Sequence, residues 1–184
     1  MSILGDMVNE KKGIKENLDD NYFEFYVAGY TKQCEGVETQ PNHALLYKGA
    51  ISYAHMNNIA LPMGQPDEYL FPFGKKNDVA KVLLIPEPNN PYDPNALKVK
   101  VVVNKIWASD IPNQELYLGY VPKLISRIVS HNLENLADGW IKKVRTVFKG
   151  NKYTTKVAFP WIIPPGGDDA MFMDRLAQIA REID

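Results

Sequence analysis

The side chains best suited to bind a polyanion gather between residues 140 and 156. This stretch reads WIKKVRTVFKGNKYTTK and contains six basic residues and no acidic one. Apolar residues are interleaved with the basic ones, and Gly150-Asn151 can reverse the chain, which predicts a β-hairpin with a basic outer face. Tyr153 lies close to this turn. Basic side chains beside an aromatic ring suit single-stranded nucleic acid, because phosphates need positive charge and bases stack on rings.

The net charge of the chain hides a basic middle. The 184 residues carry a formal net charge of −1, yet residues 79–163 hold 12 basic and 6 acidic side chains. This asymmetry favours a polyanion-facing surface on the middle segment. Lysines scattered over a solvated sheet would give the same count, so charge alone leaves both interpretations open.

The chain lacks the usual catalytic and metal-binding patterns. There is no phosphate-loop motif of an ATPase, no nucleophile elbow around Ser52 and no acidic cluster with metal-ligand spacing. The three histidines are far apart, and the single cysteine, Cys34, excludes a disulfide framework. We therefore expect a binding module rather than an enzyme, with no catalytic residue, metal or cofactor. A nuclease would need metal carboxylates that the sequence does not present.

Length and composition indicate one folded domain with short extensions. Apolar residues make up 45% of the chain and charged residues 23%, which is ordinary for a globular protein. No apolar run approaches the roughly 18–20 residues that span a bilayer, and the first residues lack the pattern of a signal peptide. We expect a cytoplasmic protein without membrane contact.

Short strand patterns dominate the chain, which predicts a mainly β protein with helices (α+β). Pro122 opens a helix that runs to about residue 135, and a last helix follows Gly167. The order of elements predicts a small OB- or SH3-like β-barrel with one internal helix and a C-terminal helix. The expected strands lie at residues 22–30, 79–85, 96–103, 116–121, 140–149 and 152–159.

The domain organisation follows from these elements. We expect an N-terminal arm at residues 1–21, a barrel domain at 22–163 and a C-terminal helix at 164–184. An insertion at 34–78 interrupts the barrel. Its many glycines and prolines predict loops, with at most a strand or hairpin around residues 44–55.

The most specific pattern joins a proline-rich turn to a short strand. Residues 84–99 read LIPEPNNPYDPNALKV, and residues 118–123 read LGYVPK. These segments resemble the HIRAN domain, a module of helicase-like DNA-remodelling ATPases that also occurs by itself in bacteria and phage. The family pattern is E-P-x-N-P-x-D-x-N-A-[IL]-x-V followed by [LVI]-G-[HY]-[LV]-x-[KR]. The residues that match it are Glu87, Pro88, Asn90, Pro91, Asp93, Asn95, Ala96, Leu97, Val99, Leu118, Gly119, Tyr120, Val121 and Lys123.

The resemblance covers roughly residues 22–163 and implies an OB-like fold that captures the 3′-hydroxyl end of single-stranded DNA, as in DNA repair or replication. It implies that Asp93 accepts the terminal hydroxyl, that Tyr92 stacks on a base and that Lys123 holds a phosphate. The predicted DNA-binding residues are Asp93, Tyr92, Asn90, Tyr120, Lys123, Arg127 and Tyr153.

Elementary chemistry supports this assignment but also supplies plain alternatives. A proline-flanked turn restricts Asp93, and its carboxylate attracts a hydroxyl while it repels a terminal phosphate. Asp93 and Asn90 also suit the capping of their own turn, whereas Tyr92 and Tyr120 also suit packing. The face that carries Lys123 is equally typical of a solvated helix.

A second function class is a protein-interaction module, for example a phage or mobile-element factor. The insertion 34–78 carries five tyrosines and phenylalanines, more than a passive loop needs, and long loops in compact domains are often functional. The net charge of −1 favours this class over a general DNA-coating role.

Overall fold

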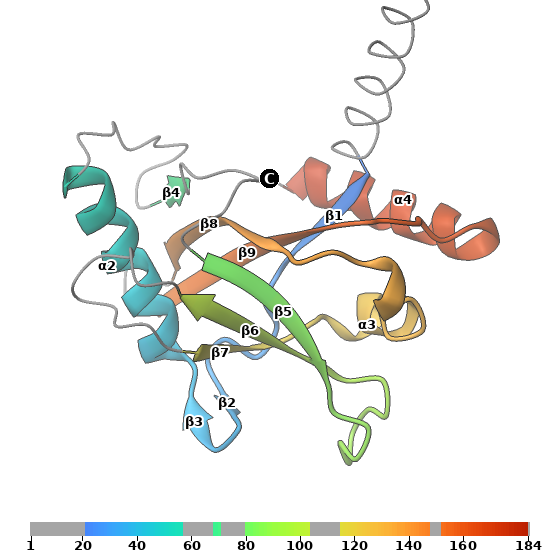
Figure 1. Ribbon diagram of the computed structural model, residues 1–184, viewed down its shortest axis with the longest axis horizontal. Helices are drawn as coiled ribbons and strands as arrows, with labels where there is room; N and C mark the ends of the chain where they lie inside the picture. The colour runs from blue at the N-terminus through green and yellow to red at the C-terminus, as the bar shows by residue number, and fades with distance from the viewer. Residues whose placement is uncertain (1–20, 57–67, 71–79, 104–114, 148–151, 184) are drawn as a thin grey trace, which may run out of the picture.

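The computed structural model describes residues 21–56, 68–70, 80–103, 115–147 and 152–183, which form a mixed α+β fold of antiparallel sheets and helices (Figure 1). The α+β class predicted from the sequence is confirmed. Residues 1–20 of the expected arm lie outside the described residues, as do residues 57–67 and 71–78 of the insertion and the hairpin turn at 148–151.

The first sheet has four antiparallel strands in the order β1-β9-β8-β4. Its first strand alternates, so that Phe23 and Phe25 enter the core while Glu24 and Tyr26 lie on the other face. The strands are β1 (Tyr22–Tyr26), β9 (Lys152–Pro160), β8 (Trp140–Val147) and β4 (Glu68–Leu70).

The second sheet has three antiparallel strands in the order β5-β6-β7. Along β6, every second residue from Leu97 to Val103 is buried, as the alternation of the sequence predicts. The strands are β5 (Ala80–Pro86), β6 (Leu97–Val103) and β7 (Glu115–Tyr120).

Two pairs of backbone contacts join these sheets. Ala28 and Tyr120 exchange hydrogen bonds of 2.8 and 2.9 Å, and Val82 and Gly139 exchange bonds of 3.1 and 2.9 Å. Both sheets contribute to one hydrophobic core. The strands form separate four- and three-stranded sheets that are not closed into one barrel by strand pairing among the described residues.

Helices lie at both ends of the sheets: α2 at one end, α3 and α4 toward the other (Figure 1). A small hairpin precedes α2. The helices are α2 (Gln40–Met56), α3 (Lys123–Val129), the short 3-10 helix η1 (Leu133–Asn135) and α4 (Gly167–Ile183), and the hairpin strands are β2 (Gln33–Cys34) and β3 (Val37–Glu38). Among the described helices, none is both long and apolar enough to cross a membrane.

Two expectations about helices were wrong. The strand or hairpin expected at residues 44–55 is part of α2, whose Pro41 occupies the first turn, where a missing N–H is tolerated. The helix expected to reach residue 135 ends at Val129. The Asn132 side chain donates to the Ile128 carbonyl at 2.8 Å, which satisfies a terminal carbonyl and favours the break.

Candidate nucleic-acid interface

The proline-rich turn between β5 and β6 is closed by its own backbone. Glu87 N–H donates to the Ala96 carbonyl at 2.9 Å, and Ala96 N–H donates to the Asp93 carbonyl at 3.1 Å. Asn90 N–H donates to the Glu87 carbonyl at 3.0 Å. The turn therefore has a defined shape, and it projects from the lower edge of the sheet in Figure 1.

Asn90 organises the tip of this turn. Its Oδ1 accepts the backbone N–H groups of Tyr92 at 2.9 Å and Asp93 at 3.0 Å. Its Nδ2 donates to the Glu87 carboxylate at 3.2 Å. This is the local bonding that favours Asn in turns, so Asn90 has the capping role that the sequence left open.

The two carboxylate oxygens of Asp93 have different surroundings. Oδ1 accepts the backbone N–H of Asn95 at 2.9 Å, which is also a turn-capping bond. Oδ2 lies 3.4 Å from the hydroxyl oxygen of Ser126 on α3. That hydroxyl also lies 3.1 Å from the Lys123 carbonyl and has one proton to donate. Oδ2 therefore keeps capacity to accept a further hydrogen bond.

Tyr92 is 89% exposed although its backbone is held in place. A large aromatic side chain rarely remains so open without a partner. The combination of a fixed main chain and an accessible ring suits stacking against a planar ligand, because little freedom is lost when the ligand binds.

Tyr120 connects the turn to β7. Its hydroxyl lies within hydrogen-bonding reach of the side chains of Glu87 and Cys34, and burial together with Glu87 raises the pKa of Tyr120 well above its usual value. Tyr120 is therefore a neutral donor. Burial also raises the pKa of the Cys34 thiol, which disfavours thiolate chemistry there.

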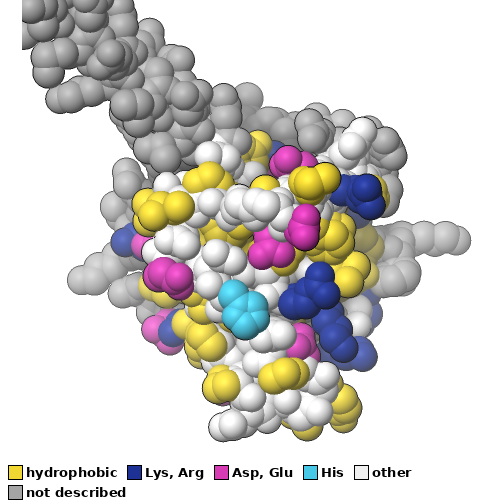
Figure 2. Space-filling view, turned by 90° about the vertical axis from the view of Figure 1, so that its right-hand side faces the viewer, with side chains coloured by type: hydrophobic (Ala, Val, Ile, Leu, Met, Phe, Trp, Pro, Cys, Tyr) yellow, Lys and Arg dark blue, Asp and Glu magenta, His cyan; other side chains and the backbone are white. Residues whose placement is uncertain are grey.

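The two basic residues of α3 lie in different settings. Lys123 is exposed at the first position of the helix that contacts Asp93 through Ser126. The guanidinium carbon of Arg127 lies 5.8 Å from the ring centre of Phe172 on α4. Lys123 thus belongs to the neighbourhood of the turn, while Arg127 is directed to α4. Figure 2 shows basic side chains gathered toward one edge of the face of the molecule opposite α2.

Tyr153 lies beside α2 rather than at the turn. Its ring centre is 5.0 Å from that of Tyr47. Its backbone N–H and carbonyl both pair with the side-chain amide of Gln40, each at 2.8 Å. The structure therefore brings together Asp93, Tyr92, Asn90, Tyr120 and Lys123, and separates Tyr153 from them.

The predicted basic hairpin is formed by β8 and β9, but several of its cations are engaged by β1 rather than left in solvent. Lys156 is only 4% exposed and pairs with Glu24 at 3.0 Å, and Lys142 pairs with the same carboxylate. Arg145 stacks on Tyr26 with its guanidinium carbon 4.3 Å from the ring centre. The reason is β1, which places an acid and an aromatic ring beside these cations. Lys149 lies outside the described residues.

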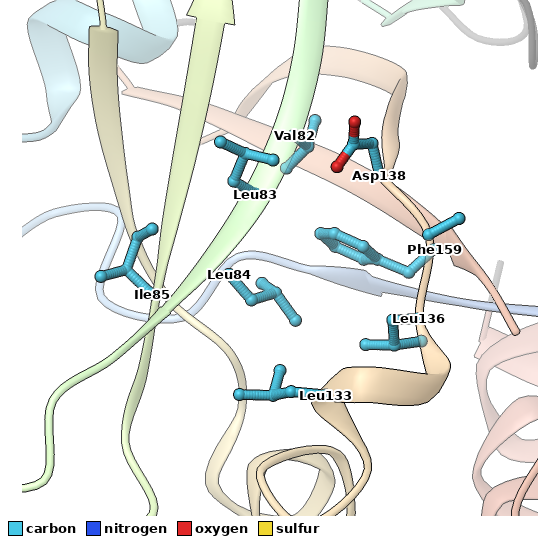
Figure 3. A pocket seen from close by; sticks show the side chains of 9 residues that line it. Val82, Leu83, Leu84, Ile85, Leu133, Leu136, Asp138 and Phe159 are labelled. Atoms are coloured by element: carbon cyan, nitrogen blue, oxygen red, sulfur yellow. The ribbon is translucent and has the colours of Figure 1, made fainter. Parts of the chain in front are cut away.

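An apolar hollow of about 240 Å³ lies between β5, η1 and β9. Leu84, Leu133, Leu136 and Phe159 surround it, and Asp138 lies at one end (Figure 3). The sequence does not predict this hollow, because residues 133–135 were expected to continue the helix that follows Pro122.

Sequence reasoning also missed Ser126 and the supporting role of Glu87. The three-residue spacing from Glu87 to Asn90 was visible in the motif, but nothing in the sequence places Ser126 against Asp93. In the described part of the chain, no group of three or more His, Cys, Asp or Glu side chains is arranged to hold a metal ion.

Comparison of the chain with protein-family models, with curated proteins and with solved structures finds no match.

Proposed function

We propose that this chain is a HIRAN-like module that binds single-stranded DNA and captures its 3′-hydroxyl end at the turn 87–96. The observation that carries the proposal is the pairing of a half-buried carboxylate, Asp93, which keeps acceptor capacity on Oδ2, with the exposed ring of Tyr92.

The chemistry of these groups matches an unmodified DNA end. A terminal hydroxyl donates a proton to Asp93 Oδ2, whereas a terminal phosphate meets like charge at the same place. The base stacks on Tyr92, an interaction worth roughly 1–3 kcal/mol that does not read sequence. Lys123, beside the turn on α3, neutralises a backbone phosphate.

We also propose that the two sheets form an OB-like barrel. Two pairs of exchanged hydrogen bonds support it. Ala28–Tyr120 joins the chain after β1 to the end of β7, and Val82–Gly139 joins β5 to the chain before β8, so the two sheets are connected at two places. This arrangement makes β7, which carries Tyr120, a neighbour of β1.

The test compares short 5′-labelled deoxythymidine oligonucleotides that end in a 3′-hydroxyl or a 3′-phosphate, by fluorescence anisotropy. We expect tighter binding of the hydroxyl end, and we expect Asp93→Asn to weaken that binding roughly tenfold or more and to reduce the preference. Asn retains an oxygen that can accept the Asn95 N–H, so the turn keeps its cap.

Asp138→Asn is the matched control, because it removes an exposed carboxylate beside the apolar hollow. We expect this variant to keep the wild-type preference for the 3′-hydroxyl end over the 3′-phosphate end. Equal affinity of the wild-type protein for the two ends would refute the assignment of Asp93.

The alternative, a protein partner that binds residues 34–78, is the expectation if no oligonucleotide binds at all. Of the aromatic side chains in that insertion, Tyr47 is already in contact with Tyr153. A partner that co-purifies with the full chain and is lost when residues 36–74 are deleted would favour this alternative.

A further inference from the structure

The outer edge of β5 is only partly covered by the rest of the chain. In the sheet order β5-β6-β7, β5 is an edge strand, and its outer side faces the segment that leads into β8. There Val82 and Gly139 exchange two backbone hydrogen bonds, as neighbouring antiparallel strands do. The pairing goes no further, because Ala137 N–H donates instead to the Pro160 carbonyl at 3.1 Å. Beyond Val82, β5 therefore has no neighbouring strand on this side among the described residues.

The backbone of Leu84 is directed to this uncovered side. In an antiparallel ladder, the N–H and C=O groups of successive residues point alternately to one neighbour and to the other. Those of Val82 point outward, so those of Leu84, two residues along, do the same. The Leu97 carbonyl, in register with Pro86, accepts from Val121 on the far side of β6 and agrees with this alternation. Within the described part of the chain, no backbone group is bonded to Leu84 on its outer side.

The apolar hollow lies beside this position. Figure 3 shows the Leu84 side chain pointing toward Leu133 and Leu136, and Phe159 forms another wall. Residues that lie opposite each other on neighbouring strands point their side chains to the same face of the sheet. A strand residue paired with Leu84 would therefore place its side chain in the hollow. The volume of about 240 Å³ accommodates one side chain of the size of leucine or phenylalanine.

We propose that the β5 edge at Leu84 binds an extended peptide segment of a partner protein by strand addition. The peptide residue opposite Leu84 donates to its carbonyl and accepts from its N–H, as Gly139 does at Val82. Its apolar side chain fills the hollow, so that main-chain bonds supply affinity and the hollow supplies selectivity. The peptide continues a ladder that the chain itself begins. This site does not depend on the proposed 3′-end site at the turn 87–96.

The surroundings of Leu84 restrict the peptide further. Pro86, the next residue whose backbone points outward, has no N–H, so the peptide meets only a carbonyl there. At the other end of the hollow, Asp138 lies 3.9 Å from Lys81, and both side chains are more than half exposed. Such a pair contributes little. Antiparallel pairing turns the C-terminal end of the peptide toward Gly139, so a basic residue after the apolar one has a favourable charge partner in Asp138.

The test follows the Leu84 amide of the full chain, isotope-labelled at its leucines, by NMR during titration with acetyl-Thr-Val-Thr-Leu-Lys-amide. We expect a saturable shift of this amide. The matched control is the same peptide methylated on the leucine nitrogen. It keeps the apolar side chain but cannot donate to the Leu84 carbonyl, so we expect it to bind roughly threefold more weakly or worse. Replacing the peptide lysine by glutamine is expected to weaken binding to a smaller extent.

Substitution of Ala137 tests the hollow from the protein side, because Ala137 is exposed and lines it. Ala137→Phe is expected to fill the hollow and to weaken peptide binding roughly tenfold or more, whereas Ala137→Ser retains the wild-type affinity. If Ala137→Phe fails to fold, the methylated peptide still decides.

Equal affinity for the methylated and unmethylated peptides would overturn strand addition and indicate a site for small apolar groups only. The absence of any shift of the Leu84 amide at millimolar peptide, or wild-type affinity in a folded Ala137→Phe variant, would overturn the site. None of these outcomes depends on what oligonucleotides show at Asp93.

Discussion

At the scale of single residues, different side chains of the turn 87–96 hold its shape and remain open to a ligand. Both ends of the Asn90 side-chain amide form hydrogen bonds within the turn: the oxygen accepts from Tyr92 and Asp93, and the nitrogen donates to Glu87. Tyr92 gives only its backbone to that network and leaves its ring in solvent. The sequence marks both residues equally, but only their bonding shows that Asn90 shapes the turn while Tyr92 is free to meet a ligand.

His43 is the residue whose ionisation matters most for stability. It is buried on α2, where Nε2 donates to the Leu118 carbonyl at 2.8 Å and Nδ1 lies 2.7 Å from the Thr155 hydroxyl oxygen. A carbonyl only accepts, so the proton is on Nε2 and the Thr155 hydroxyl donates to Nδ1. Burial lowers the pKa of His43 to about 4 from its ordinary value of 6.5.

This pKa predicts a specific loss of stability in mild acid. Between about pH 6.5 and 4, the unfolded chain binds a proton at His43 that the folded chain does not. The contribution is complete above that range and falls with decreasing pH, by about 3 kcal/mol in total. We expect urea unfolding to show a smaller decrease across this range for His43→Gln than for wild type.

His131→Gln is the control, because His131 is exposed. It is expected to follow the wild-type dependence on pH. A His43 ring that titrates near pH 6.5 in the folded protein, measured by NMR, would contradict the prediction.

At the scale of elements, α2 is attached to the sheets by polar side chains of its first turn. Gln40 pairs with the backbone of Tyr153, Asn42 donates to the Tyr117 carbonyl at 2.9 Å, and His43 bonds to both sheets. In the following turns of α2, Leu46 and Ala50 are buried in the hydrophobic core. The helix is therefore stabilised by tertiary contacts that bridge distant parts of the chain.

These contacts explain which elements the sequence could predict. The strand β6 and the turn after β5 carry their own signals, in alternating burial and in fixed turn chemistry. The helix α2 does not, because Pro41 and Gly49 suggest loops unless the partners of Gln40 and His43 are known. The same limit applies to Tyr153 and Lys156, whose surroundings come from α2 and from β1.

Gly119 is the position in β7 where an ordinary side chain cannot fit. Its φ of +134° is unfavourable for other residues, and a Cβ there would lie 2.3 Å from the Ala28 carbonyl oxygen. We expect Gly119→Ala to lower the free energy of unfolding by roughly 3 kcal/mol or more, as measured by denaturant titration.

Gly166→Ala provides the comparison, because a Cβ at Gly166 meets no atom within 4 Å and its φ lies outside the left-handed region. It is expected to change stability little. If Gly119→Ala were equally mild, the close approach of Ala28 to β7 would be wrong.

At the scale of the whole molecule, the small net charge of −1 limits any electrostatic attraction to DNA. Many of the cations are already engaged: Lys98 with Glu35, Lys100 with Glu115, and Lys142 and Lys156 with Glu24. Binding at the turn should therefore depend on few phosphates and only weakly on salt.

A salt titration of oligonucleotide affinity measures the number of phosphates that the protein contacts. Each phosphate contact contributes about 0.7 to the slope of log affinity against log salt for a single strand. We expect Lys123→Gln to reduce the slope by about that amount. Lys48→Gln, an exposed lysine on α2, is expected to leave it unchanged. An unchanged slope for Lys123→Gln would remove this lysine from the interface.

The exchanged hydrogen bonds at Ala28–Tyr120 and Val82–Gly139 also restrict how the molecule can fluctuate. The two sheets cannot separate at one of these hydrogen-bonded pairs without straining the other pair, because both sheets contribute to the same hydrophobic core. The amide protons of these four residues are thus shielded until the entire domain opens, and their deuterium uptake would follow global rather than local unfolding.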